Sequence, residues 1–208
     1  VEDVFRGPAF VSTRRRVPIV PMGIGGSDAA LPIGKKMIRP RKVVMFIGEG
    51  PGFHENEQGR PFVGAAGRFL EELLASVGLT RQQVFICNVV KCRPPGNRDP
   101  LPEEIDACAK YLEAQIRIIN PRIIVTLGRF SMARFFPGAR IGAIHGKARQ
   151  AGGRTIVAMY HPAAALHQPS LRATVEADFA VLRPLLETAA APPAEPDPAA
   201  DAKQLNLF

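Results

Sequence analysis

Four short apolar runs rich in β-branched side chains alternate along the chain with segments of helical period. The runs lie at 43–47 (VVMFI), 84–90 (VFICNVV), 123–127 (IIVTL) and 155–160 (TIVAMY). Short and nearly continuous apolar runs are typical of strands that are buried on both faces of a parallel sheet. We therefore predict four buried strands, with a hairpin turn at Gly152-Gly153 just before the fourth.

Three segments carry apolar residues at the spacing of one helix face. The first covers 69–77 and is followed by Gly78, a residue favoured just after a helix end. The second covers 105–119, and the third covers 171–185, where we expect Pro184 to distort the helix. Strands that alternate with helices imply right-handed crossovers. The pattern predicts an α/β fold at 43–187, a three-layer αβα domain around a central four-stranded parallel sheet.

The segments on either side of this domain lack such periodicity. Residues 1–42 combine three consecutive arginines with several prolines and a glycine cluster, which predicts an irregular basic arm. Residues 188–203 are almost entirely Ala, Pro and acidic residues, which predicts a disordered linker. Three apolar side chains return in the last five residues, 204–208 (QLNLF).

Composition excludes several classes of protein. The chain is 46% hydrophobic and 22% charged, as in ordinary globular proteins, and three cysteines are too few for a disulfide scaffold. No apolar run approaches the roughly 18 residues of a membrane helix, and the first residues lack the apolar core of a signal peptide. We expect a cytoplasmic monomer that does not bind membranes.

The net charge of +8 indicates an anionic partner such as nucleic acid. Much of this charge lies outside the predicted domain, because residues 1–42 hold nine basic and three acidic side chains. Residues 188–208 hold one basic and three acidic side chains. The domain itself is therefore only moderately basic.

Unusual residues follow each predicted strand at its carboxyl end, the edge where open parallel sheets bind ligands. They are the glycine-rich turn 48–52 (GEGPG), Asn88 with KCRPPGNR after it, Gly128-Arg129, and His161-Pro162. Each feature alone is more often structural, since a glycine-rich turn is usually only a tight turn and a lone histidine usually a satisfied core residue. Their convergence on one edge indicates a site. The first turn has neither the Walker A nor the dinucleotide-binding spacing.

Three longer motifs carry a family resemblance. They are GEGPGFHENEQGRPFVGAAG at 48–67, NVVKCRPPGNRDPLPEEIDAC at 88–108, and HPAAALHQP at 161–169. In this order they resemble the family 4 uracil-DNA glycosylases, the iron–sulfur class, and the likeness runs from about 43 to 187. The resemblance implies a monofunctional enzyme that hydrolyses the N-glycosidic bond of deoxyuridine in DNA. It would release uracil and leave an abasic site, the first step of base excision repair.

The resemblance also implies roles for individual residues. Phe62 would stack on a uracil flipped out of the DNA, Asn88 would bind the pyrimidine edge, and His161 would donate a hydrogen bond to the uracil anion. Glu55 would lie beside pyrimidine C5 and crowd a thymine methyl group. The catalytic residues are then Glu49, Asn88 and His161, and the uracil-binding residues are Gly48, Glu49, Gly50, Glu55, Phe62, Asn88 and His161.

The third motif departs from the family pattern after His-Pro-Ala. Leu166 is the candidate wedge that opens the duplex, but it follows Ala164-Ala165. His167-Gln168 stand where the family commonly has Arg-Asn. We therefore expect weaker phosphate contact here and a preference for single-stranded substrates.

Cys92 and Cys108 match two of the four cysteine ligands of the family's structural [4Fe–4S] cluster. The family takes the other two from a CxxC before the first strand, and residues 1–86 contain no cysteine. A shift of one nucleotide would let codons for Val17 to Met22 read Cys-Arg-Ser-Cys-Pro-Trp. We hypothesise that 1–42 is largely an out-of-frame translation, which the codons of Val17 and Val20 decide.

The terminal peptide resembles the short motif by which bacterial repair and replication proteins bind the DNA sliding clamp. Gln204 would supply amide hydrogen bonds, while Leu205, Leu207 and Phe208 would supply apolar contacts. Two alternatives to uracil excision stay open. The chain is a clamp-tethered DNA-binding protein with an impaired active site, or it is a glycosylase for another deaminated base such as hypoxanthine.

Overall fold

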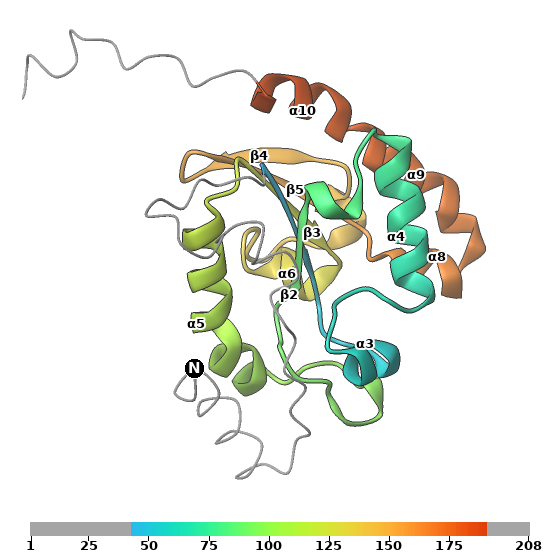
Figure 1. The fold of residues 1–208 in the computed structure, drawn as a ribbon, viewed down its shortest axis with the longest axis vertical. Helices are drawn as coiled ribbons and strands as arrows, with labels where there is room; N and C mark the ends of the chain where they lie inside the picture. Colours follow the sequence, from blue (N-terminus) through green and yellow to red (C-terminus); the bar gives the residue numbers. More distant parts are fainter. Residues whose placement is uncertain (1–42, 191–208) are drawn as a thin grey trace, which may run out of the picture.

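The computed structural model describes residues 43–190, which form a five-stranded sheet with the order β2-β1-β3-β5-β4 (Figure 1). Four of the strands are parallel, namely β1 (Val44–Gly48), β2 (Phe85–Asn88), β3 (Ile123–Leu127) and β5 (Arg154–Met159). They lie within the four apolar runs or overlap them closely. The α/β fold and the parallel core of the sheet are as predicted.

The fifth strand corrects the prediction of a four-stranded sheet. β4 (Ala148–Ala151) pairs antiparallel with β5 at one edge of the sheet. Its side chains are mostly exposed and its sequence, ARQA, has no apolar run, so the periodicity of the chain gave no signal for it. Gly152 and Gly153 have φ values of 56° and 71° and form the predicted hairpin turn between β4 and β5.

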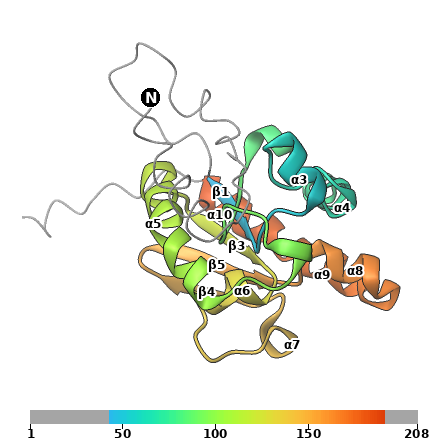
Figure 2. The same ribbon diagram turned by 90° about the horizontal axis from the view of Figure 1, so that it is seen from below.

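Helices cover both faces of the sheet and complete three layers (Figures 1 and 2). α5 (Pro102–Ile119) covers one face, where it packs on Met45, Ile47 and other buried strand residues. α4 (Ala65–Ser76) and α9 (Arg172–Ala180) cover the opposite face, which includes Val44 and Phe46. Successive strand residues thus enter different cores, as the alternation of side chains along a strand requires.

The predicted third helix is divided in two. α9 ends before Val181, and α10 (Leu182–Ala190) begins directly after it. Pro184 lacks the N–H that would bond to the carbonyl of Ala180, and its ring crowds that carbonyl. The distortion therefore falls one turn before the proline. Because α10 continues to Ala190, it also includes residues 188–190, which the sequence placed in the linker.

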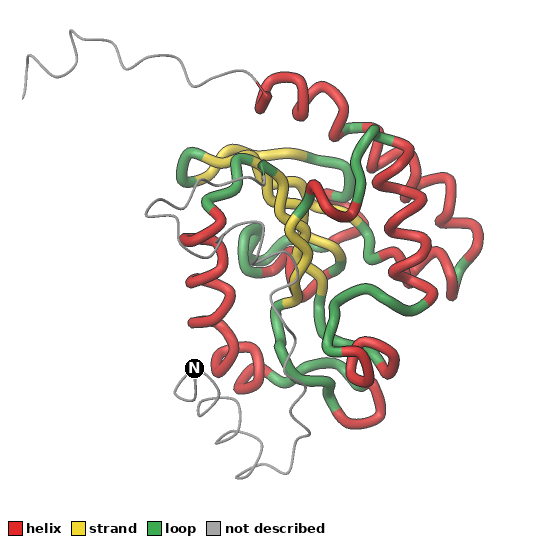
Figure 3. Tube along the Cα trace, in the orientation of Figure 1, coloured by secondary structure: helices red, strands yellow, loops and turns green. Residues whose placement is uncertain are grey.

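Short elements fill the connections (Figure 3). They are α3 (Phe53–Gln58), η2 (Arg81–Gln83), η3 (Pro95–Asn97), α6 (Arg129–Ala133), α7 (Ile141–Ile144), α8 (Pro162–His167) and η4 (Pro169–Leu171). Among the described helices, none combines the length and hydropathy needed to cross a bilayer. The predicted arm at 1–42, the rest of the predicted linker and the candidate clamp-binding peptide at 204–208 lie outside the described residues.

Candidate active site at the carboxyl edge of the sheet

A pocket of about 670 Å³ opens where the parallel strands end. Six of the predicted uracil-binding residues line it: Glu49, Gly50, Glu55, Phe62, Asn88 and His161. The seventh, Gly48, is the register partner of Asn88 in the β1–β2 pair. A Cβ atom at Gly48 would lie 2.5 Å from Asn88 Oδ1 and 2.6 Å from the Phe62 ring, so only glycine leaves room for both side chains.

Asn88, the last residue of β2, presents an unpaired polar atom in this pocket. The residue is only 1% exposed, and within the described part of the chain its Oδ1 has no hydrogen-bond partner. Buried polar atoms are normally paired, so one left open in a pocket indicates a ligand. The Lys91 ammonium donates to the backbone carbonyl of Asn88 at 2.6 Å and to Gln115 Oε1 at 2.7 Å, which ties the strand end to α5.

His161 is held as a neutral imidazole at the start of α8. Burial lowers its pKa from the ordinary 6.5 to about 4. Its Nδ1 accepts a hydrogen bond from the backbone N–H of Ala163 at 3.1 Å, as the helix N-cap. Because a backbone N–H only donates, Nδ1 carries the lone pair and Nε2 carries the proton. The ring therefore offers one N–H donor without a positive charge.

Phe62 has an unusual backbone conformation. Its φ of 54° lies in the left-handed region, which costs a bulky residue about 1–3 kcal/mol. Its ring is 5% exposed and lies beside the imidazole of His161, with ring centroids 5.3 Å apart and planes inclined by 24°. Phe62 is thus a buried aromatic residue of the pocket lining, in the turn that follows α3.

Glu49 is the carboxylate nearest to the strand ends. Burial raises its pKa above 4.5, while the backbone N–H of Phe130 and the charge of Arg129 act in the opposite direction. The Phe130 N–H donates to Glu49 Oε1 at 3.2 Å. A Cβ atom at Gly128 would lie 2.4 Å from the same oxygen, so this glycine provides space for the carboxylate.

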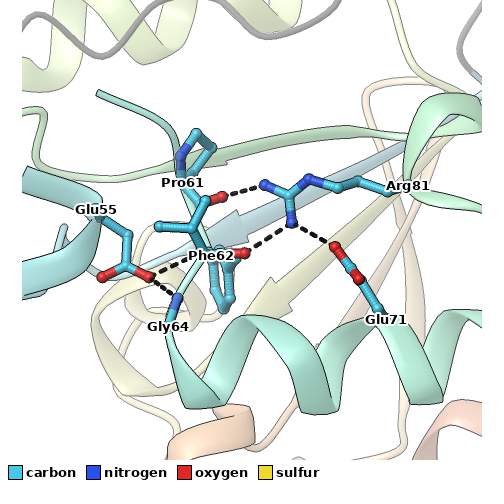
Figure 4. Close-up of polar contacts among 7 residues, drawn as sticks. Glu55, Pro61, Phe62, Gly64, Glu71 and Arg81 are labelled. Carbon is cyan, nitrogen blue, oxygen red and sulfur yellow. Dashed lines mark hydrogen bonds and ion pairs between the residues drawn. The ribbon is translucent and has the colours of Figure 1, made fainter. Parts of the chain in front are cut away.

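Glu55 binds the backbone of the turn that carries Phe62. Its Oε1 accepts hydrogen bonds from the N–H groups of Val63 at 2.8 Å and Gly64 at 2.9 Å (Figure 4). Burial alone would raise the pKa of Glu55, but these and other backbone hydrogen bonds lower it below its ordinary value. The carboxylate is therefore ionised and fixed at the pocket wall.

Two arginines and a histidine line the pocket, and an exposed leucine lies next to the histidine. The two arginines, Arg98 and Arg129, pair with Glu104 and Asp99, and the histidine is His167. The predicted wedge, Leu166, lies on α8 next to His167, with 44% of its surface exposed. An exposed, large apolar side chain next to a residue that lines the pocket suits contact with nucleic acid.

Comparison with known proteins identifies the family. A sequence model of the Uracil DNA glycosylase superfamily matches residues 36–184. The chain belongs to this superfamily. The type-4 uracil-DNA glycosylase of Sulfurisphaera tokodaii is 47% identical to it over 161 residues, which are 72% of this chain and 72% of that protein.

Two further relatives assign the chain to the same type. The type-4 uracil-DNA glycosylase of Archaeoglobus fulgidus is 47% identical over 145 residues, 65% of this chain and 73% of the relative. That of Saccharolobus solfataricus is 46% identical over 155 residues, 70% and 72% of the two chains. The chain is therefore a type-4 member of the superfamily, and the resemblance of its motifs to family 4 is confirmed.

One of the two predicted cluster ligands contacts the residue next to the other. Cys108, on α5, accepts a hydrogen bond at 3.4 Å from the backbone N–H of Lys91, the residue before Cys92. The third cysteine of the chain, Cys87, is buried in the core against α5. A [4Fe–4S] cluster takes four thiolates, and residues 43–190 contain no group of three or more potential metal ligands. The residues present do not fit a complete cluster.

Sequence reasoning missed two residues that shape the pocket from outside it. Arg81, in η2, donates hydrogen bonds to the carbonyls of Pro61 and Phe62. Gly67, in α4, lies so close to Phe62 that a Cβ atom there would be 2.0 Å from the Phe62 carbonyl oxygen. Gly67 closes the first motif, but Arg81 falls in a segment between motifs, where no pattern marks it.

Proposed function

We propose that this chain is a uracil-DNA glycosylase, which hydrolyses the N-glycosidic bond of deoxyuridine in DNA. The products are free uracil and an abasic site, the substrate of the later steps of base excision repair. The observation that carries this proposal is the buried, unpartnered Oδ1 of Asn88 in a pocket that Phe62 and the neutral His161 also line. The type-4 family membership supports the same reaction.

Uracil recognition follows from the donor and acceptor pattern of one amide. Uracil N3–H donates to Asn88 Oδ1, and Asn88 Nδ2 donates to uracil O4. Cytosine presents the reverse pattern at these two positions, so it would leave two buried polar groups unpaired. Such mismatches allow a site to reject a base analogue strongly. Phe62 supplies the aromatic face on which the flipped base stacks.

Bond cleavage separates a uracil anion from an oxocarbenium-like sugar. The C1′–N1 bond breaks with its electron pair on uracil, and the Nε2–H of His161 donates to O2 as negative charge develops there. Such a preorganised donor contributes roughly 10²–10³-fold to the rate. Glu49 stabilises the positive sugar and orients the water that adds to C1′. The proton lost by that water passes to the Glu49 carboxylate, and the uracil anion takes one from solvent.

Exclusion of thymine depends on a carboxylate that does not move aside. In our proposal Glu55 lies beside pyrimidine C5, where thymine has its methyl group. The hydrogen bonds from Val63 and Gly64 hold that carboxylate in place, since moving it would leave two backbone donors without their acceptor. The same two hydrogen bonds therefore stabilise the turn that carries Phe62 and fix the carboxylate that excludes thymine.

The rim residues provide the DNA contacts of this proposal. Arg98 and Arg129 lie at the pocket mouth, where phosphates flanking the flipped nucleotide would compete with their carboxylate partners. Leu166 acts as the wedge, without an arginine directly after it. We infer that single-stranded substrates are preferred, because they need no duplex opening.

The test is release of free uracil from a uracil-containing oligonucleotide, with thymine and hypoxanthine oligonucleotides in parallel. Uracil release alone is the expected result. Release of hypoxanthine but not uracil would favour the glycosylase for another deaminated base. DNA binding without any base release would favour the catalytically impaired, clamp-tethered protein.

Two features outside the pocket belong to the same proposal. Cys92 and Cys108 would serve as half of a structural [4Fe–4S] ligand set whose other half the printed chain lacks.

Residues 204–208 would bind the bacterial sliding clamp and tether a monomeric enzyme to its substrate, which raises the effective concentration of DNA. Titration of a 204–208 peptide against the clamp should give a dissociation constant on the order of micromolar, as expected when only a few side chains are buried. Equal binding by the Leu207→Ala/Phe208→Ala peptide would reject this role.

A further inference from the structure

The backbone around Phe62 is held from two sides by opposite charges. Figure 4 shows Glu55 reaching from α3 on one side and Arg81 reaching from the other. Glu55 accepts from the N–H groups of Val63 and Gly64, the two residues after Phe62. Arg81 donates to the carbonyls of Phe62 and of the residue before it, Pro61. Four successive residues of the turn are thus fixed through their main chain.

Arg81 is well placed for this task and is itself held in place. It is the first residue of η2, directly before β2, and its side chain is only 16% exposed. Its Nη1 lies 2.7 Å from the Phe62 carbonyl oxygen, and its Nη2 binds the Pro61 carbonyl. The planar fork of a guanidinium matches two neighbouring acceptors, which a lysine ammonium does not. A third contact, from Nη1 to Glu71 at 3.5 Å, is longer and more exposed.

The Phe62 carbonyl, one of the two that Arg81 binds, lies against the start of α4. Gly67 provides the room for it, because a Cβ there would lie 2.0 Å from the Phe62 oxygen. Phe62 meanwhile adopts a φ of 54°, which an aromatic residue avoids unless its surroundings impose it. The position of the Phe62 ring therefore depends on three features together. They are the left-handed backbone of Phe62, the space left by Gly67 and the hydrogen bonds from Arg81.

We propose that Arg81 is a positioning residue for base excision: it holds the Phe62 backbone in its left-handed conformation so that the ring faces the extrahelical base. Arg81 touches neither the pocket nor the reacting atoms, and it acts only through Phe62. This inference rests on the proposed function, because the ring is useful only if a base stacks on it. It adds a residue that none of the three sequence motifs contains.

The test is a double-mutant cycle between Arg81 and Phe62. Single-turnover uracil release from a single-stranded oligonucleotide is measured for the wild type, Arg81→Ala, Phe62→Ala and the double variant. Misplacement of the ring should slow Arg81→Ala roughly 10- to 100-fold. In the Phe62→Ala background the same change should cost less than about twofold, since the residue it acts through is gone.

Binding measurements separate positioning from a general loss of structure. Inhibition by free uracil should weaken in Arg81→Ala, while affinity for a uracil-free oligonucleotide should match that of the wild type. Arg81→Lys, which can reach one carbonyl, should have a rate and a uracil inhibition between those of the wild type and Arg81→Ala. This variant replaces Arg81→Ala in the test if Arg81→Ala does not fold. Glu71→Ala is the matched control: it removes the exposed partner of Arg81, leaves both carbonyl acceptors in place, and should behave as wild type.

The possible failures are distinguishable. A wild type that releases no uracil overturns the proposed function, and this inference with it. If the wild type is active, two results would overturn this inference alone. The first is a folded Arg81→Ala protein with the same rate and the same uracil inhibition as the wild type. The second is an Arg81→Ala effect that is equally large in the presence and in the absence of the Phe62 ring.

Discussion

At the scale of single residues, the fold determines protonation states that cannot be predicted from the sequence motifs. The sequence places a histidine after one strand and a glutamate after another, and the family resemblance gives them roles. Burial then lowers the pKa of His161 to about 4 and raises that of Glu49. The lone pair on His161 Nδ1 depends on one backbone N–H at a helix start, a contact that exists only in the folded chain.

These shifts predict a pH profile with one acid limb. His161 stays neutral at all pH values well above about 4, so its Nε2–H donor does not titrate near the ordinary 6.5. Glu49 acts as a carboxylate, so the single-turnover rate should fall as pH drops toward its raised pKa, above 4.5. Glu49→Gln should be slow and lose this limb. A step near pH 6.5 that disappears only in His161→Gln would show instead that the imidazole is charged.

The His161 shift also affects stability, with a definite sign. Between about 4 and 6.5 the unfolded chain binds a proton at this ring that the folded chain does not. The contribution of His161 to the free energy of unfolding is therefore complete above pH 6.5 and is lost as pH falls toward 4. Denaturant unfolding at several pH values, compared between wild type and His161→Gln, would measure it.

At the scale of elements, the apolar periodicity of the sequence predicts the strands and helices that are buried in the core. It does not predict elements that bury little apolar surface. The four buried strands and the face of α5 follow from apolar periodicity. β4 does not, because an exposed edge strand buries little and needs no apolar run. The break between α9 and α10 was expected at Pro184, yet it falls at Val181, where the proline affects the carbonyl one turn earlier. The Arg81 contacts join segments 19 and 20 residues apart, a separation that no local pattern reports.

The start of α4 gives the clearest prediction at this scale. Gly67→Ala would place a Cβ 2.0 Å from the Phe62 carbonyl, a backbone atom that cannot yield cheaply. We expect a loss of about 1–3 kcal/mol in the free energy of unfolding, as for other overpacked sites, and a slower release of uracil because Phe62 shifts. Gly142→Ala is the matched control, since its new Cβ would lie 3.6 Å from the nearest atom, Tyr160 Oη. An unaffected Gly67→Ala protein would contradict the close approach.

At the scale of the whole molecule, the residues proposed for uracil binding come together, whereas the proposed cluster site has only two of the four cysteines it needs. Six of the seven residues proposed for uracil binding line one pocket, and the seventh, Gly48, is paired with Asn88. Of the two candidate cluster ligands, Cys108 contacts the backbone of Lys91, and Cys92 directly follows that residue. The family resemblance could single out Cys92 and Cys108 as candidate ligands because both lie inside its second motif. It could not supply the missing pair, whose expected place falls in residues 1–42, outside the described part of the chain.

This asymmetry predicts how the protein handles iron. The chain as printed should reconstitute less than one cluster per molecule, because two neighbouring thiolates cannot complete it. Val17→Cys/Val20→Cys should restore broad iron–sulfur absorbance near roughly 400 nm and bind iron stoichiometrically. Adding Cys92→Ser to that variant is the control and should remove the absorbance. Full cluster occupancy in the printed chain would contradict the count of ligands.

The central claim is that the pocket at the strand ends excises uracil through Asn88 and His161. Single-turnover release of free uracil from a single-stranded oligonucleotide tests it most directly, with wild type, Asn88→Ala and His161→Ala measured side by side and their folding checked by thermal unfolding. We predict uracil release by the wild type, no thymine release, and rates lower by roughly 10²-fold or more in each variant. A folded wild type that releases no uracil, or variants as fast as the wild type, would contradict it.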